Sequence, residues 1–286
     1  MLIRDALLMG REALKIHNVP SYSLDAQVLL SKVTGLDRTA LLLQDDQSLT
    51  DNQEQEYRCL LDRRAWGEPV AYLIEQKEFM GLDFKVTPAV LIPRPDTELM
   101  VETALEFLKI EGQENPRAID VGTGSGAIAI SLAHLNPGLQ VHAVDLSKKA
   151  LEIAQQNATT NQVADRVHFR QGNLLQDISQ DFQGTVSIIT ANLPYIPSGE
   201  IAGLMPDVKE YEPHLALDGG PDGLDLYRQL IPQAYPLLRT GGLLLMEIGP
   251  GQGEPALAIL PKENWSAKVI NDLAGRERLV VAKKIS

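Results

Sequence analysis

The sequence predicts an α/β protein whose mostly parallel, seven-stranded sheet ends in an antiparallel hairpin and is preceded by a small helical domain. Up to about residue 70, apolar side chains recur at helical spacing and no strong strand pattern appears. Beyond residue 116, short apolar runs alternate with helical segments, which is typical of a parallel sheet with helices on both faces. Two C-terminal strand patterns are separated by only five residues, which favours a closing hairpin.

The helical segments at the N-terminus are bounded by capping residues. Ser23 is a candidate N-cap for a helix that ends at Gly35, a residue that commonly stops helices. Thr50 and Gln53 fit a capping box, in which each side chain satisfies a backbone N–H of the other residue. These patterns predict four short helices in this part of the chain.

Three segments are expected along the chain. Residues 1–68 form the helical domain, residues 69–90 a connecting β-hairpin, and residues 91–286 the larger domain. The larger domain opens with residues 91–98, where two prolines favour extended geometry in the residues before them. Its strands are expected at residues 117–121, 140–145, 166–171, 185–191, 242–248, 267–272 and 278–283.

Composition and charge narrow the class of protein and its partners. With 286 residues, 44% of them hydrophobic and 22% charged, the chain is typical of a soluble protein with one large and one small domain. The formal net charge of −12 disfavours nucleic acid as the main partner, because a phosphate backbone needs a positive surface. The single cysteine excludes an internal disulfide, and the five scattered histidines show no metal-ligand spacing, so no metal is expected.

The expected location is the cytoplasm. No apolar run is long enough to span a bilayer, and the N-terminus lacks the basic and apolar segments of a signal peptide. We therefore expect no membrane contact. A monomer would suffice for the chemistry that the motifs indicate, and a monomer is expected.

A glycine-rich turn follows the strand predicted at residues 117–121. Its sequence is Gly122-Thr123-Gly124-Ser125-Gly126, and the glycines permit a sharp bend and the close approach of a ligand. The helix after the turn presents backbone N–H groups at its N-terminus. By itself the turn fits a dinucleotide as well as S-adenosylmethionine, so the glycines leave dehydrogenase and methyltransferase open.

Polar residues at the strand ends favour S-adenosylmethionine as the cofactor. Asp120 ends its strand where a carboxylate can face the cationic amino acid part of that molecule. Asp145 is placed to accept hydrogen bonds from ribose hydroxyls, as in either cofactor class. Asn173 can recognise the edge of an adenine ring while Leu174 packs beside it. The alternatives are helix capping or a solvated loop for the two aspartates and an ordinary turn for Asn173.

The candidate transfer motif is Asn192-Leu193-Pro194-Tyr195, which follows the apolar run at residues 186–191. An amide or exocyclic amine is a poor nucleophile, so a site that methylates it must hold the nitrogen and accept its hydrogens. The Asn192 side-chain oxygen and the Leu193 carbonyl can each accept one, and Pro194 restricts Leu193 to extended conformations. Tyr195 offers an aromatic face over a planar group. Positioning supplies most of the rate, and Asn192 is expected to face the cofactor as well as the substrate.

The chain resembles the release factor glutamine methyltransferases, also called the HemK or PrmC family, over essentially its whole length. Besides the glycine turn and the transfer motif, the matching residues lie within 78–81, 91–98, 211–217, 219–224 and 272–278. The proline-arginine segment at residues 91–98 and the last segment are more specific than the glycine turn, which many methyltransferases share.

The resemblance implies a Rossmann-like methyltransferase domain that uses S-adenosylmethionine. Its substrate would be a glutamine side-chain amide in class I peptide chain release factors, within their Gly-Gly-Gln motif. The resemblance also implies that residues 192–195 hold this glutamine, that residues 122–126, Asp145 and residues 173–174 hold the cofactor, and that the helical domain helps to dock the release factor.

One position departs from the family pattern, because the family usually has proline where this chain has Leu193. Leucine also supplies the main-chain carbonyl that the chemistry needs, so activity is expected to survive. Asn-Leu-Pro-Tyr also resembles the motif of ribosomal RNA adenine dimethylases, which makes adenine-N6 methylation of RNA or DNA the alternative function. The acidic charge, the helical domain and residues 91–98 favour glutamine.

Overall fold

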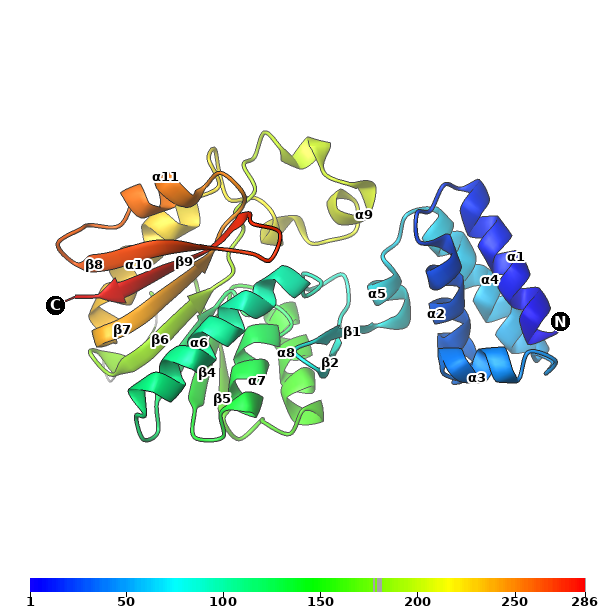
Figure 1. Ribbon diagram of the computed structural model, residues 1–286, viewed down its shortest axis with the longest axis horizontal. Coiled ribbons are helices and arrows are strands. Elements are labelled where there is room, and N and C mark those ends of the chain that lie inside the picture. Colours follow the sequence, from blue (N-terminus) through cyan, green and yellow to red (C-terminus); the bar gives the residue numbers. More distant parts are fainter. Residues whose placement is uncertain (177, 179–181, 286) are drawn as a thin grey trace. The chain divides into compact units, whose positions relative to one another are not determined.

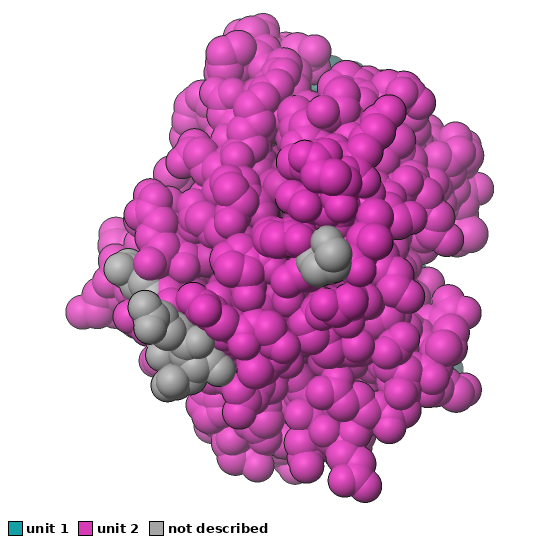
Figure 2. All heavy atoms as spheres, turned by 90° about the vertical axis from the view of Figure 1, so that its left-hand side faces the viewer, with its two compact units in different colours: residues 1–76, 205–211 teal, residues 77–204, 212–286 magenta. Residues whose placement is uncertain are grey.

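The chain divides into two units in the computed structural model, which describes residues 1–176, 178 and 182–285. Unit 1 comprises Met1–Gln76 with Met205–Tyr211, and unit 2 comprises Lys77–Leu204 with Glu212–Ser286 (Figure 2). The finer division expected at residues 68 and 90 stays a prediction.

Unit 1 is helical. Its helices are α1 (Ile3–Ile16), α2 (Tyr22–Thr34), α3 (Arg38–Leu43), α4 (Asp51–Ala65), α5 (Val70–Ile74) and α9 (Pro206–Lys209). The apolar faces of α1, α2 and α4 meet around the buried Tyr57, whose hydroxyl donates to the carbonyl of Ala26 over 3.0 Å. An interior hydrogen bond thus accompanies the apolar packing that holds these helices together.

The expected helix boundaries in unit 1 are confirmed with one exception. The capping box at the start of α4 is formed by both of its hydrogen bonds. Gly35 follows α2 in the left-handed region, at φ 71°. Ser23, however, does not cap α2, because the helix begins at Tyr22 after Ser21. The Ser21 hydroxyl donates to Asp25, one turn along the helix, and this local bond is compatible with an earlier start.

The predicted hairpin joins β1 (Gln76–Phe79) to β2 (Leu82–Lys85). Its two turn residues, Met80 and Gly81, both have positive φ, which is typical of the two-residue turns that suit the twist of paired strands. A 3₁₀ turn, η1 (Pro95–Thr97), then leads into α6 (Glu98–Glu111). The first residue of α6, Glu98, accepts a hydrogen bond from the N–H of Met80 over 3.0 Å and so ties the hairpin to this helix.

Seven strands of unit 2 form one sheet, which confirms the predicted fold class. They are β3 (Arg117–Val121), β4 (Gln140–Asp145), β5 (Val167–Gln171), β6 (Val186–Ala191), β7 (Leu238–Glu247), β8 (Trp265–Asn271) and β9 (Glu277–Lys284). Their order is β5-β4-β3-β6-β7-β9-β8, with β9 antiparallel to both neighbours and the other pairs parallel. The ends of the expected strands lie within two residues of the observed ones, except that β7 begins at Leu238 rather than at residue 242.

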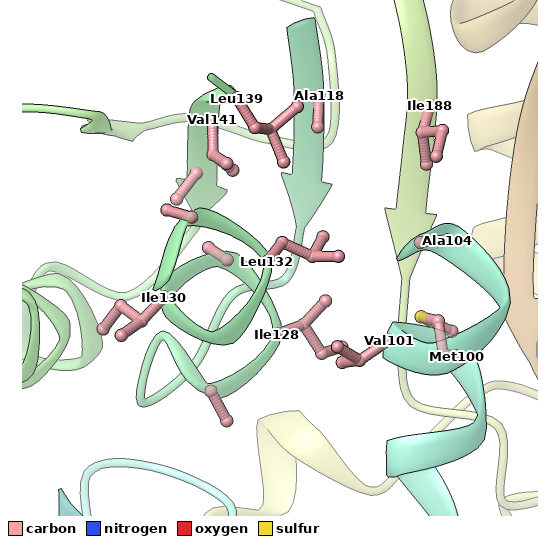
Figure 3. Close-up of a cluster of buried hydrophobic side chains, with 14 of the residues drawn as sticks. Met100, Val101, Ala104, Ala118, Ile128, Ile130, Leu132, Leu139, Val141 and Ile188 are labelled. Carbon is pink, nitrogen blue, oxygen red and sulfur yellow. The ribbon is translucent and has the colours of Figure 1, made fainter. Parts of the chain in front are cut away.

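Helices cover both faces of the sheet (Figure 1). One face carries α6, α7 (Ala127–Leu135) and α8 (Lys148–Thr160), and the other carries α10 (Asp225–Leu237) and α11 (Gly253–Ala258). Two short 3₁₀ turns, η3 (Ile201–Gly203) and η4 (His214–Ala216), lie between β6 and α10 in the sequence. Figure 3 shows part of the apolar core on the first of these faces, where side chains of α6 and α7 meet those of β3, β4 and β6. Because both faces are buried, the central strands are continuous apolar runs. Within the described residues, no helix has the length and apolarity needed to cross a membrane.

Candidate active site

The carboxyl ends of β3, β4, β5 and β6 bring the expected polar residues to one edge of the sheet. Because β3 pairs with β4 on one side and β6 on the other, the chain winds away from it in both directions, and open sheets bind ligands at such a point. A cavity of about 220 Å³ lies there, and its lining includes Gly122, Thr123, Gly124, Ser125, Asp145, Asn173, Leu174, Asn192, Leu193 and Pro194. The other three residues expected in the site, Asp120, Gly126 and Tyr195, do not belong to the lining.

The glycine turn is shaped by close contacts as well as by backbone freedom. Gly122 has φ 72°, and a Cβ there would lie 2.8 Å from Cδ2 of Leu193. Gly126 has φ 82° at the start of α7, and a Cβ there would lie 2.7 Å from Cδ1 of Ile130. A side chain at either position would therefore displace the cavity wall or the first turns of α7.

Asp145, at the end of β4, supports the turn and also lines the cavity. Its two carboxylate oxygens accept hydrogen bonds from the N–H groups of Gly124 and Ser147, each over 2.8 Å. Burial raises the pKa of Asp145 above its ordinary value. Each oxygen keeps a lone pair for a ligand hydroxyl, so the arrangement fits the expected ribose contact, which stays a prediction.

Asp120 is buried behind the turn and is held by two hydroxyl groups. Thr123 donates to its Oδ2 over 2.6 Å, and Thr190 donates to its Oδ1 over 2.8 Å. Burial raises the pKa of Asp120 to about 6, although both hydrogen bonds oppose this shift. The carboxylate therefore anchors Thr123 beneath the turn. Its expected contact with the amino acid part of the cofactor stays a prediction.

The loop after β5 contributes Asn173 and Leu174 to the lining. Leu174 has φ 52°, a conformation that costs a leucine about 1–2 kcal/mol. The next residue, Leu175, donates its N–H to Gln233 of α10 over 2.9 Å, which holds the loop in this form. Backbone strain that is retained at a cavity wall is often associated with function, and the expected packing of Leu174 beside an adenine stays a prediction.

The lining as a whole suits S-adenosylmethionine. A ribose needs hydrogen-bond acceptors, which Asp145 supplies, and a flat ring needs apolar walls, which Ile128, Leu146 and Leu174 supply. The glycine turn permits the backbone to approach the ligand closely.

The side chain of Asn192 is oriented by Thr97, although 95 positions separate them in the sequence. Asn192 Nδ2 donates to Thr97 Oγ1 over 3.2 Å. Thr97 is itself buried, and its hydroxyl oxygen accepts this hydrogen bond. Because an amide nitrogen only donates, the order of this bond is fixed, with Asn192 donating and Thr97 accepting. This order leaves the Asn192 side-chain oxygen as the acceptor for a bound amide.

The rest of the transfer motif divides between the cavity and the core. Leu193 and Pro194 line the cavity, and the Leu193 N–H donates to the Tyr227 hydroxyl over 3.3 Å. Tyr195 instead packs against the apolar core between the sheet and the helices α10 and α11, and its hydroxyl donates to Glu247 over 3.4 Å. Its expected position over a planar substrate group stays a prediction.

Sequence reasoning missed several residues that hold the site together: Thr97, Glu247, Tyr227 and Asn157. Asn157, on α8, donates to the carbonyls of Ser125 over 2.9 Å and Lys85 over 3.0 Å, which links the glycine turn to the hairpin. A polar residue on the apolar face of α8 was the available signal. For Glu247 the signal was a carboxylate that ends an apolar strand, the same pattern that selected Asp120.

Together, the fold and the site define this protein as an S-adenosylmethionine-dependent methyltransferase. A family model described as "Methyltransferase domain" matches residues 112–248. The solved catalytic domain of hMettl16, in complex with MAT2A 3′UTR hairpin 6, is similar with a TM-score of 0.57 and 16% identity, over 83% of each chain. A similarity at this identity concerns the fold alone.

The whole chain is similar to one group of such enzymes. A family model described as "PrmC N-terminal domain" matches residues 5–74. The release factor glutamine methyltransferase of Moorella thermoacetica is 45% identical over 285 residues, which are 99% of this chain and 98% of that protein. The protein of the same name from Bradyrhizobium diazoefficiens is 44% identical over 268 residues, 92% of this chain and 88% of that one. The chain belongs to the release factor glutamine methyltransferase family, as its motifs predicted.

Proposed function

We propose that this protein methylates the side-chain amide nitrogen of the glutamine in the Gly-Gly-Gln motif of class I peptide chain release factors. The hydrogen bond from Asn192 to Thr97 carries the proposal, because it leaves the Asn192 oxygen to accept from a planar NH₂ group. The curated relatives that match nearly the whole chain are named for this substrate. Release factors work on ribosomes, so we place the enzyme in the cytoplasm with a release factor as its partner.

The residues of the site hold the glutamine amide in place rather than deprotonate it. S-adenosylmethionine supplies a methyl group on a positively charged sulfur. The Asn192 side-chain oxygen and the Leu193 carbonyl each accept one hydrogen of the NH₂ group, and Pro194 keeps Leu193 extended. The nitrogen gains the methyl group and then loses a proton to water, so a strong base is not required. Positioning supplies most of the rate.

Adenine methylation is the less favoured alternative. The same pair of acceptors would suit the exocyclic amine of adenine. The net charge of −12, however, opposes binding of a phosphate backbone, and the matching relatives are named for glutamine. The similarity to hMettl16 concerns the fold alone and gives no information about the substrate of this protein.

Labelled S-adenosylmethionine tests the proposal directly. The purified protein would be offered a class I release factor or ribosomal RNA, and the label would be located by mass spectrometry. Label on the Gly-Gly-Gln glutamine is expected. A release factor with asparagine in place of that glutamine is the matched control, because asparagine has the same amide group on a side chain that is one methylene group shorter. Label on an RNA adenine instead would replace the proposal with the alternative.

A further inference from the structure

The hydroxyl of Tyr227 lies where strands β6 and β7 end, next to the transfer motif. Tyr227 belongs to α10, and its side chain is fully buried. It donates to the carbonyl of Glu247 at the end of β7, and the carbonyl of Ala191 at the end of β6 lies 3.2 Å away. The N–H of Leu193 donates to the same hydroxyl oxygen over 3.3 Å. One hydroxyl group therefore connects both strand ends to Leu193.

Leu193 stands directly before Pro194 in the transfer motif, and unlike a proline it has a backbone N–H. A proline there would have no N–H, so the bond to Tyr227 exists only because the residue is not proline. A proline ring would also restrict φ to about −65°, whereas leucine leaves φ free. The carbonyl of this residue is the acceptor proposed for the second hydrogen of the glutamine amide. A leucine in this place therefore needs another constraint.

Two contacts supply that constraint. The Leu193 N–H is held by Tyr227, and the buried Leu193 side chain lies so close to Gly122 that a Cβ there would approach it to 2.8 Å. On the other side, Pro194 restricts the Leu193 ψ angle. The N–H bond thus acts on φ of Leu193, the backbone angle that Pro194 restricts less narrowly.

We propose that Tyr227 is a positioning residue for methyl transfer, because its hydroxyl holds the Leu193 N–H and thereby orients the Leu193 carbonyl, as a proline ring would do by its geometry. The catalytic consequence rests on the proposed function. The hydrogen bond itself does not, and it is testable without a substrate.

Amide hydrogen exchange of the full chain tests the bond in the absence of substrate. In Tyr227→Phe, the Leu193 N–H is expected to exchange at least about tenfold faster than in the parent, relative to the amides of β6. Tyr57→Phe is the matched control, because it removes a similarly buried hydroxyl from the core of unit 1. It should leave exchange at Leu193 unchanged. Equal exchange at Leu193 in the parent and in Tyr227→Phe would overturn the proposal.

Methyl-transfer kinetics test the consequence for catalysis. Tyr227→Phe is expected to lower kcat about tenfold and to leave the cofactor Kd within about twofold, because a buried N–H loses its acceptor. In a Leu193→Pro background, Tyr227→Phe is expected to lower kcat by less than about threefold, because residue 193 then has no N–H that could lose its partner. If Tyr227→Phe lowers kcat equally in both backgrounds, the Tyr227 hydroxyl acts only through its bonds to the carbonyls of Ala191 and Glu247, and the proposal is overturned. If the parent methylates no release factor, the proposed function fails, while hydrogen exchange still decides the role of Tyr227.

Discussion

Asn192 and Thr97 are joined by a hydrogen bond of 3.2 Å between the loop after β6 and the segment that leads into α6. Thr97 is buried, so its hydroxyl is held in place by its surroundings and fixes the direction of the Asn192 amide. The bond needs a hydrogen-bond acceptor at position 97, which the threonine hydroxyl supplies.

Thr97→Val is therefore expected to lower kcat about tenfold, because the Asn192 amide loses its partner and can turn. Thr97→Ser keeps the hydroxyl and is expected to retain most of the activity. Steady-state methylation of the release factor, with the cofactor Kd measured by calorimetry, separates orientation from binding. Equal losses in the two variants would show that packing, not the hydroxyl, matters at this position.

Asn192→Ala removes the proposed acceptor itself. The expected result is a fall in kcat of about 10²–10³-fold, the range found when a single aligned polar group is removed from an active site. The cofactor Kd should stay within about threefold, because the glycine turn and Asp145 are unchanged. Single-turnover methylation and calorimetry on the same preparation measure both quantities. Undiminished turnover would remove Asn192 from the mechanism.

Asp145→Ala acts on the cofactor instead of the substrate. The variant loses the acceptor expected for the ribose hydroxyls and also the bonds to the N–H groups of Gly124 and Ser147. The cofactor Kd is expected to rise about 10–100-fold, as for the loss of hydrogen bonds to a charged group. Asp145→Asn keeps one acceptor oxygen and should give an intermediate value. An unchanged Kd in the alanine variant would reject the ribose contact.

Asp120 makes the stability of the fold depend on pH. Its pKa is about 6 in the folded protein, against an ordinary value of 3.8, so the folded state binds this proton more tightly than the unfolded chain. Its contribution to the free energy of unfolding therefore falls as the pH rises from about 4 to about 6, and it stays low above that range. Asp120→Asn has no such proton, so its stability relative to the parent should increase over this range by an amount on the order of 3 kcal/mol. Denaturant unfolding at several pH values checks this, and a difference that does not vary with pH would contradict it.

Gly10 of α1 allows Tyr57 to approach the helix. A Cβ on Gly10 would lie 2.0 Å from the Tyr57 hydroxyl oxygen, which is closer than any stable contact. Gly10→Ala should therefore destabilise the protein by about 1–3 kcal/mol, although alanine is ordinarily the better helix former. Leu8→Ala, at an exposed position of the same helix, is the control and should change the free energy of unfolding by less than about 0.5 kcal/mol. Thermal unfolding of the full chain compares the two.

Local sequence patterns were sufficient for most of the secondary structure. The limits of β3 and β4 agree with the predicted strands, because a strand covered on both faces is a continuous apolar run that ends where the chain meets polar loops. Local patterns did not predict the start of α2 correctly. Ser21 and Ser23 are both suitable N-caps by residue type, and only the folded backbone distinguishes them.

The sequence by itself determined which chemical groups lie at the carboxyl edge of the sheet, since residues that follow parallel strands must emerge there. The tertiary structure alone decided which of these groups touch. It joins Asn192 to Thr97 and Leu193 to Tyr227, and it places Asp120 and Tyr195 outside the cavity lining. The physical reason is that a hydrogen bond requires its partners to be placed within a few tenths of an ångström. Between distant segments, this placement comes from the packing of helices on the sheet, which no local pattern of residues describes.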